Sequence, residues 1–313
     1  MKYCKQLFHD LNFEPTDIRP CCDMRRIGIP RVPFSGGNFD MESYFESIKT
    51  FFFDLQKDSS PCVGCPSLVS KPTGFSLVMK FDTISVNQHR HFCNCRCKYC
   101  DLWYPKYAAT SPRPYAIHPV LKQLRTSNLL SATPFLSWGG GEPTLLEEFE
   151  ETNKWAMEND FVQYVHTNAL QISPSVVNML YSGKGKVNVS LDSYDSESYQ
   201  NVKGVDGWEA VINTLKTYMG LPEARQRVDV KYLIYEENNR LSNIHHFFGV
   251  CRDLGVTNVQ YSFNFREINK NAVSKKSLHA AMLFRKLAKE MNMTAAPFFL
   301  PQKYLQLLNK LEQ

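Results

Sequence analysis

Residues 91–101 read HFCNCRCKYCD, and this stretch carries the most informative spacing in the chain. Within it Cys93, Cys97 and Cys100 form a Cys-x3-Cys-x2-Cys array. A loop with this spacing can wrap three thiolates around an iron–sulfur cube, one thiolate for each of three irons. The fourth iron then lacks a protein ligand, so the array predicts a cluster with one corner open to a small molecule.

A structural zinc ion is the alternative occupant of this loop. Such a site is closed by four ligands, and Cys95 is the thiol at hand to act as the fourth. Cys95 stands two residues from both Cys93 and Cys97, where it would be cramped as a ligand. We therefore interpret Cys95 as a bystander.

Short β-rich runs and helical patterns alternate on both sides of the cysteine stretch. Strands are predicted at residues 75–82, 135–138, 162–166, 186–191, 228–235 and 259–265. Helices are predicted at residues 119–130, 147–158, 174–181, 207–218, 241–254 and 275–291. Six strand–helix units in a row indicate an α/β fold with a parallel sheet and helical crossovers. Because six units are fewer than eight, we expect an open, partial (β/α)6 TIM-like barrel.

A second set of cysteines lies in residues 1–74, which prolines interrupt and which show helical periodicity only near residues 41–54. Gly64, inside the Cys-x2-Cys knuckle of residues 62–65, lets the backbone turn so that both sulfurs face one ion. Four thiolates can be assembled for a metal site, from Cys4, Cys21, Cys62 and Cys65. Cys22 is an alternative to Cys21, and the occupant is either structural zinc or an iron–sulfur cluster.

The array of Cys93, Cys97 and Cys100, with Tyr99 before its last cysteine, resembles the signature loop of the radical S-adenosylmethionine (SAM) superfamily. One strand–helix unit later, residues 138–143 read WGGGEP and resemble the GGEP motif of the same family. The resemblance implies a [4Fe-4S] cluster whose open iron is chelated by SAM. It further implies reductive cleavage of SAM to a 5′-deoxyadenosyl radical that abstracts hydrogen from a substrate, with an electron donor such as flavodoxin or ferredoxin. A partial barrel is also the usual core of this family.

The resemblance also implies which residues contact SAM. Consecutive glycines bare the main chain for a ligand, and in the family this backbone receives the SAM ammonium. The expected cofactor-binding residues are Tyr99, Gly140, Gly141, Glu142, Pro143, Thr167, Asn168, Ser190 and Lys203. Lys203 stands where the family usually has arginine, and an ammonium is a point charge and not a bidentate fork. Asp192 is the catalytic candidate, as a proton acceptor near the substrate, with capping of a turn as its alternative role.

The N-terminal cysteines resemble the SPASM or twitch extensions of radical SAM enzymes, although those extensions usually follow the barrel and this one precedes it. The resemblance implies an auxiliary iron–sulfur cluster in this segment. The expected domains are a cysteine-rich segment at residues 1–74, the barrel at residues 75–292 and a helical tail at residues 293–313.

Composition narrows the possible partners. Apolar residues make 43% and charged residues 21% of the 313 residues, which is ordinary globular composition, and the net charge is +5. The chain shows neither a membrane-length apolar run nor a signal peptide. We therefore expect a cytoplasmic enzyme whose ten cysteines bind metal clusters rather than form disulfides.

The expected reaction is oxidation or cross-linking of a peptide or sugar substrate. No long block of basic residues is present, so nucleic acid is an unlikely partner. The alternatives are a tRNA- or pterin-modifying radical SAM enzyme and a non-catalytic zinc or iron–sulfur module.

Overall fold

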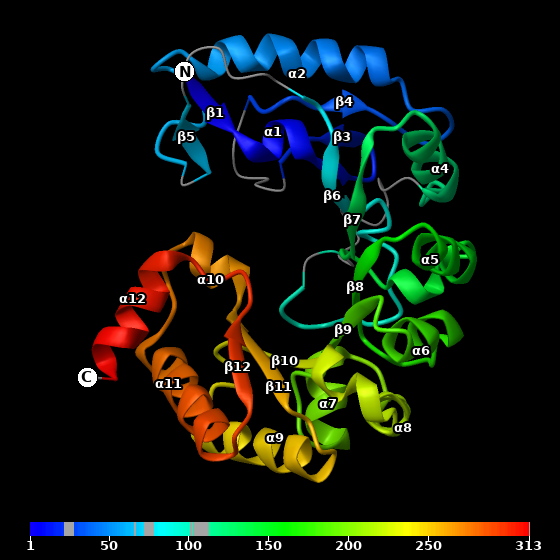
Figure 1. Ribbon diagram of the computed structural model, residues 1–313. Helices are drawn as coiled ribbons and strands as arrows, with labels where there is room; N and C mark the ends of the chain where they lie inside the picture. The colour runs from blue at the N-terminus through cyan, green and yellow to red at the C-terminus, as the bar shows by residue number, and fades with distance from the viewer. Residues whose placement is uncertain (22–27, 66, 72–77, 101, 103–112, 313) are drawn as a thin grey trace. The chain divides into compact units, whose positions relative to one another are not determined.

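The computed structural model describes residues 1–21, 28–65, 67–71, 78–100, 102 and 113–312 (Figure 1). The chain divides into two compact units. Unit 1 comprises Met1–Cys93 and Leu102–Tyr164, and unit 2 comprises Asn94–Asp101 and Val165–Gln313. The division falls inside the cysteine stretch, because Cys93 belongs to unit 1 and Cys97 and Cys100 belong to unit 2.

The main sheet of unit 1 has the strand order β7-β6-β2-β3-β4. Its strands are β2 (Asp10–Phe13), β3 (Asp17–Arg19), β4 (Val32–Pro33), β6 (Phe81–Val86) and β7 (Leu130–Trp138). β6 runs parallel to both β2 and β7, whereas β3 is antiparallel to β2 and to β4. A separate antiparallel pair is formed by β1 (Lys2–Cys4) and β5 (Leu68–Ser70).

The helices of unit 1 follow from capping and from apolar spacing. Asp40 accepts a hydrogen bond from the Ser43 amide at 3.0 Å and so begins α2. Every three or four residues along α2 an apolar side chain is buried, in the order Tyr44, Ile48, Phe51, Phe52 and Leu55. The helices are α1 (Lys5–His9), α2 (Met41–Leu55), α4 (His118–Thr126), α5 (Phe149–Glu158) and the 3₁₀ helix η1 (Pro143–Leu145).

The sheet of unit 2 has the strand order β12-β11-β10-β9-β8. Neighbouring strands from β9 to β12 are parallel. The strands are β8 (Val162–Thr167), β9 (Gly185–Ser190), β10 (Val228–Ile234), β11 (Asn258–Phe263) and β12 (Thr294–Pro297). The chain passes from unit 1 to unit 2 within β8.

Helices connect the parallel strands of unit 2, as a βαβ architecture requires. They are α6 (Pro174–Tyr181), α7 (Ser196–Lys203), α8 (Trp208–Met219), the 3₁₀ helix η2 (Pro222–Arg227), α9 (Leu241–Asp253), α10 (Phe265–Asn269), α11 (Lys275–Glu290) and α12 (Gln302–Leu311). α9 and α11 cover one face of the sheet (Figure 1). On this face the ring centroids of Tyr232 and Phe247 are 4.8 Å apart, and those of Tyr261 and Phe284 are 5.4 Å apart.

The two faces of the unit 2 sheet differ in chemistry. Parallel sheets are usually apolar on both faces, and the helix-covered face follows this rule. On the other face, alternate residues of β9, β10 and β11 are polar, namely Asn188, Ser190, Asp229, Lys231, Gln260 and Ser262. We call these six residues the polar face.

The prediction of an α/β fold with parallel strands is confirmed. The first strand of the predicted series differs, since β6 begins at Phe81 and not at residue 75, and residues 75–77 lie outside the described ones. In the described part of the chain, no helix has both the length and the apolar character that crossing a membrane requires.

Candidate functional site

Both Cys-x2-Cys pairs in the chain close the same kind of turn. The Cys100 amide donates to the Cys97 carbonyl at 3.0 Å, and the Cys65 amide donates to the Cys62 carbonyl at 2.9 Å. In the second turn Gly64 has φ +75°, which glycine adopts without a steric penalty. A turn of this kind brings the side chains of its first and last residues to one side, as two ligands of one group require.

In unit 2, Tyr99 of the cysteine stretch joins a buried ion pair. The Lys203 ammonium lies 2.5 Å from Asp192 Oδ2, and the exposed fractions of the two residues are 1% and 0%. The Tyr99 hydroxyl donates to the same Oδ2 at 2.5 Å and accepts from Lys203 at 3.1 Å. The Leu233 amide donates to Asp192 Oδ1 at 2.7 Å, so both carboxylate oxygens are engaged.

The electrostatics keep this pair charged. Burial alone would raise the pKa of Asp192, but Lys203 and then Lys231 offset it and hold that pKa below its usual value. Burial opposes the charged form of Lys203 in the same way, but Asp192, followed by Cys97, together with smaller contributions outweighs it and raises the pKa of Lys203. Around neutral pH the two groups are therefore an ammonium and a carboxylate.

Backbone pairing holds the cysteine stretch against the end of α7. The Arg96 amide donates to the Lys203 carbonyl at 2.8 Å, and the Lys98 amide donates to the Val202 carbonyl at 3.0 Å. Gly204, with φ +69°, makes this approach possible, because a Cβ there would lie 2.7 Å from the Arg96 carbonyl oxygen. Cys97 is thus fixed between two backbone hydrogen bonds.

Cys97 has the electrostatics of a ligand thiol. A hydrogen bond from Cys95 lowers the pKa of Cys97 to about 6, with Lys203 contributing in the same direction and burial opposing both. The thiolate is the form that binds metal. Cys95, which we interpreted as a bystander, donates a hydrogen bond to Cys97, the predicted ligand.

The predicted strand-end residues of unit 2 form tight turns. Thr167 Oγ1 accepts from the Ala169 amide at 2.9 Å, and Asn168 Oδ1 accepts from the Leu170 amide at 3.0 Å. The Asn168 side chain also donates to Asn94 Oδ1 at 2.7 Å, which ties the end of β8 to the cysteine stretch. Ser190 ends β9 and is half-buried.

In unit 1, the glycine run after β7 packs against the residues that lead to Cys93. The Glu142 amide donates to the Phe92 carbonyl at 2.8 Å. Gly140 has φ +95°, and a Cβ on Gly141 would lie 2.2 Å from the Phe92 carbonyl oxygen. No larger residue fits at position 141 without moving backbone.

Glu142 and Pro143 complete this corner of unit 1. Glu142 is 1% exposed, and its Oε1 accepts from the Thr144 hydroxyl at 2.8 Å and from the Thr144 amide at 3.2 Å. Pro143 is the first residue of η1. The Glu142 carboxylate therefore caps a helical turn, and the main chain of Gly140 and Gly141 is the part of the motif left to meet a ligand.

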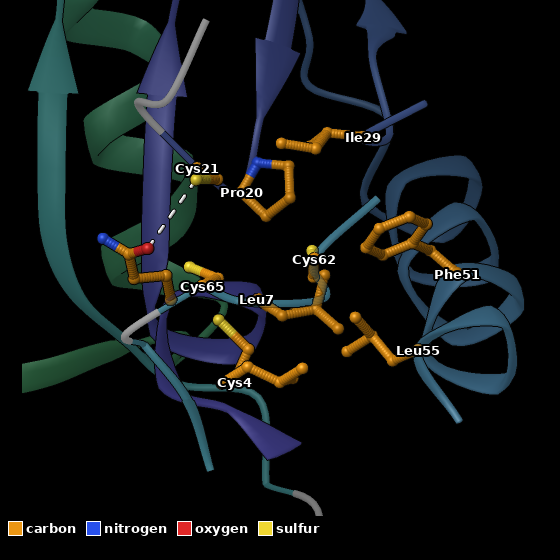
Figure 2. Close-up of a pocket in the computed structure, with 11 residues that line it drawn as sticks. Cys4, Leu7, Pro20, Cys21, Ile29, Phe51, Leu55, Cys62 and Cys65 are labelled. Carbon is orange, nitrogen blue, oxygen red and sulfur yellow. Dashed lines mark hydrogen bonds between the residues drawn. The ribbon is translucent and has the colours of Figure 1, made fainter. Parts of the chain in front are cut away.

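The four N-terminal cysteines line one cavity of unit 1. Figure 2 shows the sulfurs of Cys4, Cys21, Cys62 and Cys65 around a shared space. The cavity itself is small, with a volume of about 20 Å³. The Cys21 thiol lies 3.6 Å from Gln6 Oε1. Burial raises the pKa of Cys4, while the backbone amides of Leu7 and Gln6 act in the opposite direction. Cys22, the alternative ligand, lies outside the described residues.

The spread of these thiols bears on what they can hold. Among the residues that the structure describes, no three His, Cys, Asp or Glu side chains gather closely enough for a single metal ion. Zinc would need every sulfur within about 2.3 Å of one point, whereas a four-iron cube places its thiolates on separate corners. An all-cysteine donor set can hold either a zinc ion or an iron–sulfur cube.

Two residues near the predicted site did not enter the sequence prediction. Gly204 follows Lys203 and allows the close approach of the cysteine stretch. Lys231 lies in the middle of β10, and its charge influences the pKa of Asp192. The available signal for Lys231 was the alternation of charged and apolar residues in VDVK, which places Asp229 and Lys231 on one face of the strand.

Comparison with known proteins finds similarity to one enzyme superfamily. Residues 87–239, which hold the cysteine array and the glycine run, match the family model of the radical SAM superfamily. SuiB of Streptococcus suis bound to its precursor peptide SuiA is similar in structure, at a TM-score of 0.56 and 13% identity over 99% of this chain and 75% of that one. The structure of SuiB bound to S-adenosylmethionine is similar at a TM-score of 0.52 and 14% identity, over 82% of this chain and 56% of that one.

A further similar structure is anSMEcpe with bound AdoMet, with a TM-score of 0.53 and 16% identity over 68% of this chain and 63% of that one. At such identities these structures share the fold, a partial TIM barrel. This chain spans less than two thirds of the length of two of the three. The match to the radical SAM superfamily model covers residues 87–239, just under half of the chain.

Proposed function

We propose that this protein reductively cleaves SAM at a [4Fe-4S] cluster held by Cys93, Cys97 and Cys100. When bound, the cluster supplies one electron to SAM, which yields methionine and a 5′-deoxyadenosyl radical that takes a hydrogen atom from the substrate. The single observation that supports this most is the presence of all three cysteines and of the glycine run inside the segment that matches the family model.

The protein's own residues would position the reactants. Tyr99, Asp192 and Lys203 fix the part of the loop that carries Cys97 and Cys100, and the main chain of Gly140 and Gly141 would receive the SAM ammonium. Asp192 accepts three hydrogen bonds and stays ionised, which supports a positioning role over transfer of a proton. Thr167 and Asn168 act through the turn that they build.

The substrate that we propose is a peptide, with a sugar as the alternative. The likeness in fold to SuiB, whose structure contains a precursor peptide, supports a peptide. A tRNA- or pterin-modifying enzyme would share the same core, and salt-sensitive RNA binding would separate the tRNA case. Oxidation or cross-linking would be the outcome, with flavodoxin or ferredoxin as electron donor.

For the N-terminal cysteines we propose an auxiliary iron–sulfur cluster bound by Cys4, Cys21, Cys62 and Cys65. The four cysteines line one cavity, which supports this proposal, and structural zinc is the alternative. Such a cluster could take the electron from the substrate radical. Metal analysis after anaerobic reconstitution separates the cases, because two cubes give about eight irons per chain and one cube gives about four.

The decisive experiment uses two cysteine variants. Cys97→Ala removes a proposed ligand, whereas Cys251→Ala removes a buried thiol on α9 and serves as the control. With dithionite and SAM under anaerobic conditions, we expect 5′-deoxyadenosine from the wild type and from Cys251→Ala but not from Cys97→Ala. Equal 5′-deoxyadenosine formation by all three proteins would refute the proposed function.

A further inference from the structure

Three side chains of the polar face hydrogen-bond to one another. Asn188 of β9 donates to Gln260 of β11 at 2.5 Å, and Gln260 donates to Asp229 of β10 at 2.9 Å. Buried polar groups that are paired in this way carry little free energy for binding a ligand. The residues available for binding are therefore the polar-face residues outside this hydrogen-bonded group, which include Ser190 and Lys231.

Lys231 is the next polar-face residue along β10 after Asp229. In the register of the sheet it stands between Ser190 of β9 and Gln260 of β11. Its side chain is half-buried, and its ammonium lies 5.3 Å from the centroid of the Phe298 ring. Phe298 in turn packs against His166, with ring centroids 5.3 Å apart. An aromatic face thus covers one side of the ammonium.

The Lys231 ammonium lacks an anionic partner in the described part of the chain. Asp192 influences it electrostatically, but the three hydrogen bonds to Asp192 come from Lys203, Tyr99 and the Leu233 amide. Burial lowers the pKa of Lys231, which is the response of a cation that has lost water without gaining an ion pair. A bound anion would restore the missing interaction.

Lys203 cannot supply this interaction instead. Its ammonium is 1% exposed and already held by Asp192 at 2.5 Å. Turning it toward another anion would leave the Asp192 carboxylate buried without its counterion, which costs about 3–5 kcal/mol in comparable pairs. The cation of this region that remains open to a ligand is Lys231.

We infer that Lys231, with the Ser190 hydroxyl beside it in register, is a binding site for a carboxylate or phosphate group. This inference rests on the proposed function, which offers two sources for the anion. One is the carboxylate of SAM, and the other is an acidic group of the substrate. In the first case Lys231 takes the role that the family resemblance gives to position 203.

Affinity measurements distinguish the two sources. The reconstituted holoprotein is titrated anaerobically with SAM and with decarboxylated SAM, in the wild type, in Lys231→Met and in Lys186→Met. Lys186 is an exposed lysine of β9 and serves as the matched control. If SAM provides the anion, the preference for SAM over decarboxylated SAM in the wild type and in the control exceeds that in Lys231→Met by about tenfold, as one charge-assisted hydrogen bond allows.

A labelling experiment on the wild-type holoprotein tests the site without any substitution. A small imidoester modifies accessible amines, and peptide mass spectrometry follows its rate at Lys231 in SAM-loaded protein. Inorganic phosphate and acetate are compared with chloride at equal ionic strength. If the substrate provides the anion, Lys231→Met keeps the preference for SAM, but phosphate or acetate slows labelling of Lys231 in the wild type. Exposed Lys216 should react at one rate throughout.

The inference is overturned if Lys231→Met keeps the preference for SAM and neither phosphate nor acetate slows labelling of Lys231. Failure of the proposed function looks different. A wild-type protein that binds neither SAM nor decarboxylated SAM would refute the proposed function, whereas labelling of Lys231 with and without phosphate would still decide whether the anion site exists.

Discussion

Replacing Asp192 by asparagine should destabilise unit 2 strongly. The amide keeps the size of the carboxylate and an acceptor for the Leu233 amide, but it leaves the Lys203 ammonium buried without a counterion. Removing one partner of a buried ion pair costs about 3–5 kcal/mol. The Tyr99 hydroxyl, 3.1 Å from the ammonium, remains as a neutral partner, so we expect about 3 kcal/mol.

A matched double variant separates the charge effect from packing. Lys203→Met alone should also destabilise the protein, because it leaves Asp192 buried and ionised. In Asp192→Asn/Lys203→Met both charges are absent, so its loss should be smaller than the sum of the two single losses. Chemical unfolding followed by tryptophan fluorescence measures all three variants.

The pH dependence of the same variant has a defined direction. Because the folded pKa of Asp192 is lowered, its contribution is present above the unfolded value of about 3.9 and is lost as pH falls through the folded pKa. Because the pKa of Lys203 is raised, its contribution is present below about 10.4 and is lost as pH rises through the folded pKa. The stability difference between wild type and Asp192→Asn should therefore be greatest between about pH 4 and pH 10. Equal unfolding free energies at pH 7 would refute this account of the pair.

Three further predictions concern unit 1 and its cysteines. Gly141→Ala should destabilise the fold by about 2–4 kcal/mol, because its Cβ would meet the Phe92 carbonyl. The control, Gly249→Ala in α9, should stabilise the fold by up to about 1 kcal/mol, because its Cβ meets nothing within 4 Å. Equal unfolding midpoints for these two variants would contradict the steric argument. Burial lowers the pKa of His89 to about 3, so below pH ~6.5 the unfolded state binds a proton at His89 that the folded state does not bind. The unfolding free energy of the wild type should therefore fall by up to about 1.4 kcal/mol per pH unit on acidification because of His89, and His89→Gln should remove this contribution. An unchanged slope of unfolding free energy against pH in His89→Gln would argue against this. Cys65→Ser should lower the iron content of the reconstituted chain from about eight to about four, and a value that stays at eight would exclude Cys65 as a ligand.

Elements with strong local signals were predictable from the sequence. Helix α6 has the predicted bounds of residues 174–181, because Ser173 caps it and Pro174 opens it. Strand β2 was missed since its four residues are too short to show alternation, and it depends on pairing with β6. Helix α7 was missed because its sequence, SESYQNVK, is mostly polar, although Asp195 and Ser198 form a capping box at its start.

The candidate site was predictable where chemistry depends on local spacing. The predicted ligand role of the cysteines rests on their spacing along the chain. The pairing of Asp192 with Lys203 does not, because it requires a positive φ at Asp192 and the burial of both side chains in the fold. The same limit applies to Lys231, whose neighbours Ser190 and Gln260 come from two other strands.

The contrast between the two faces of the unit 2 sheet separates stability from recognition. Aromatic packing of Tyr232 and Tyr261 against α9 and α11 holds the strands in place on one side. Ser190 and Lys231 lie on the opposite face and are half-buried, outside that packing. Substitutions at these two positions should therefore cost less folding free energy than substitutions of the two tyrosines, so directed evolution toward new substrates should begin there.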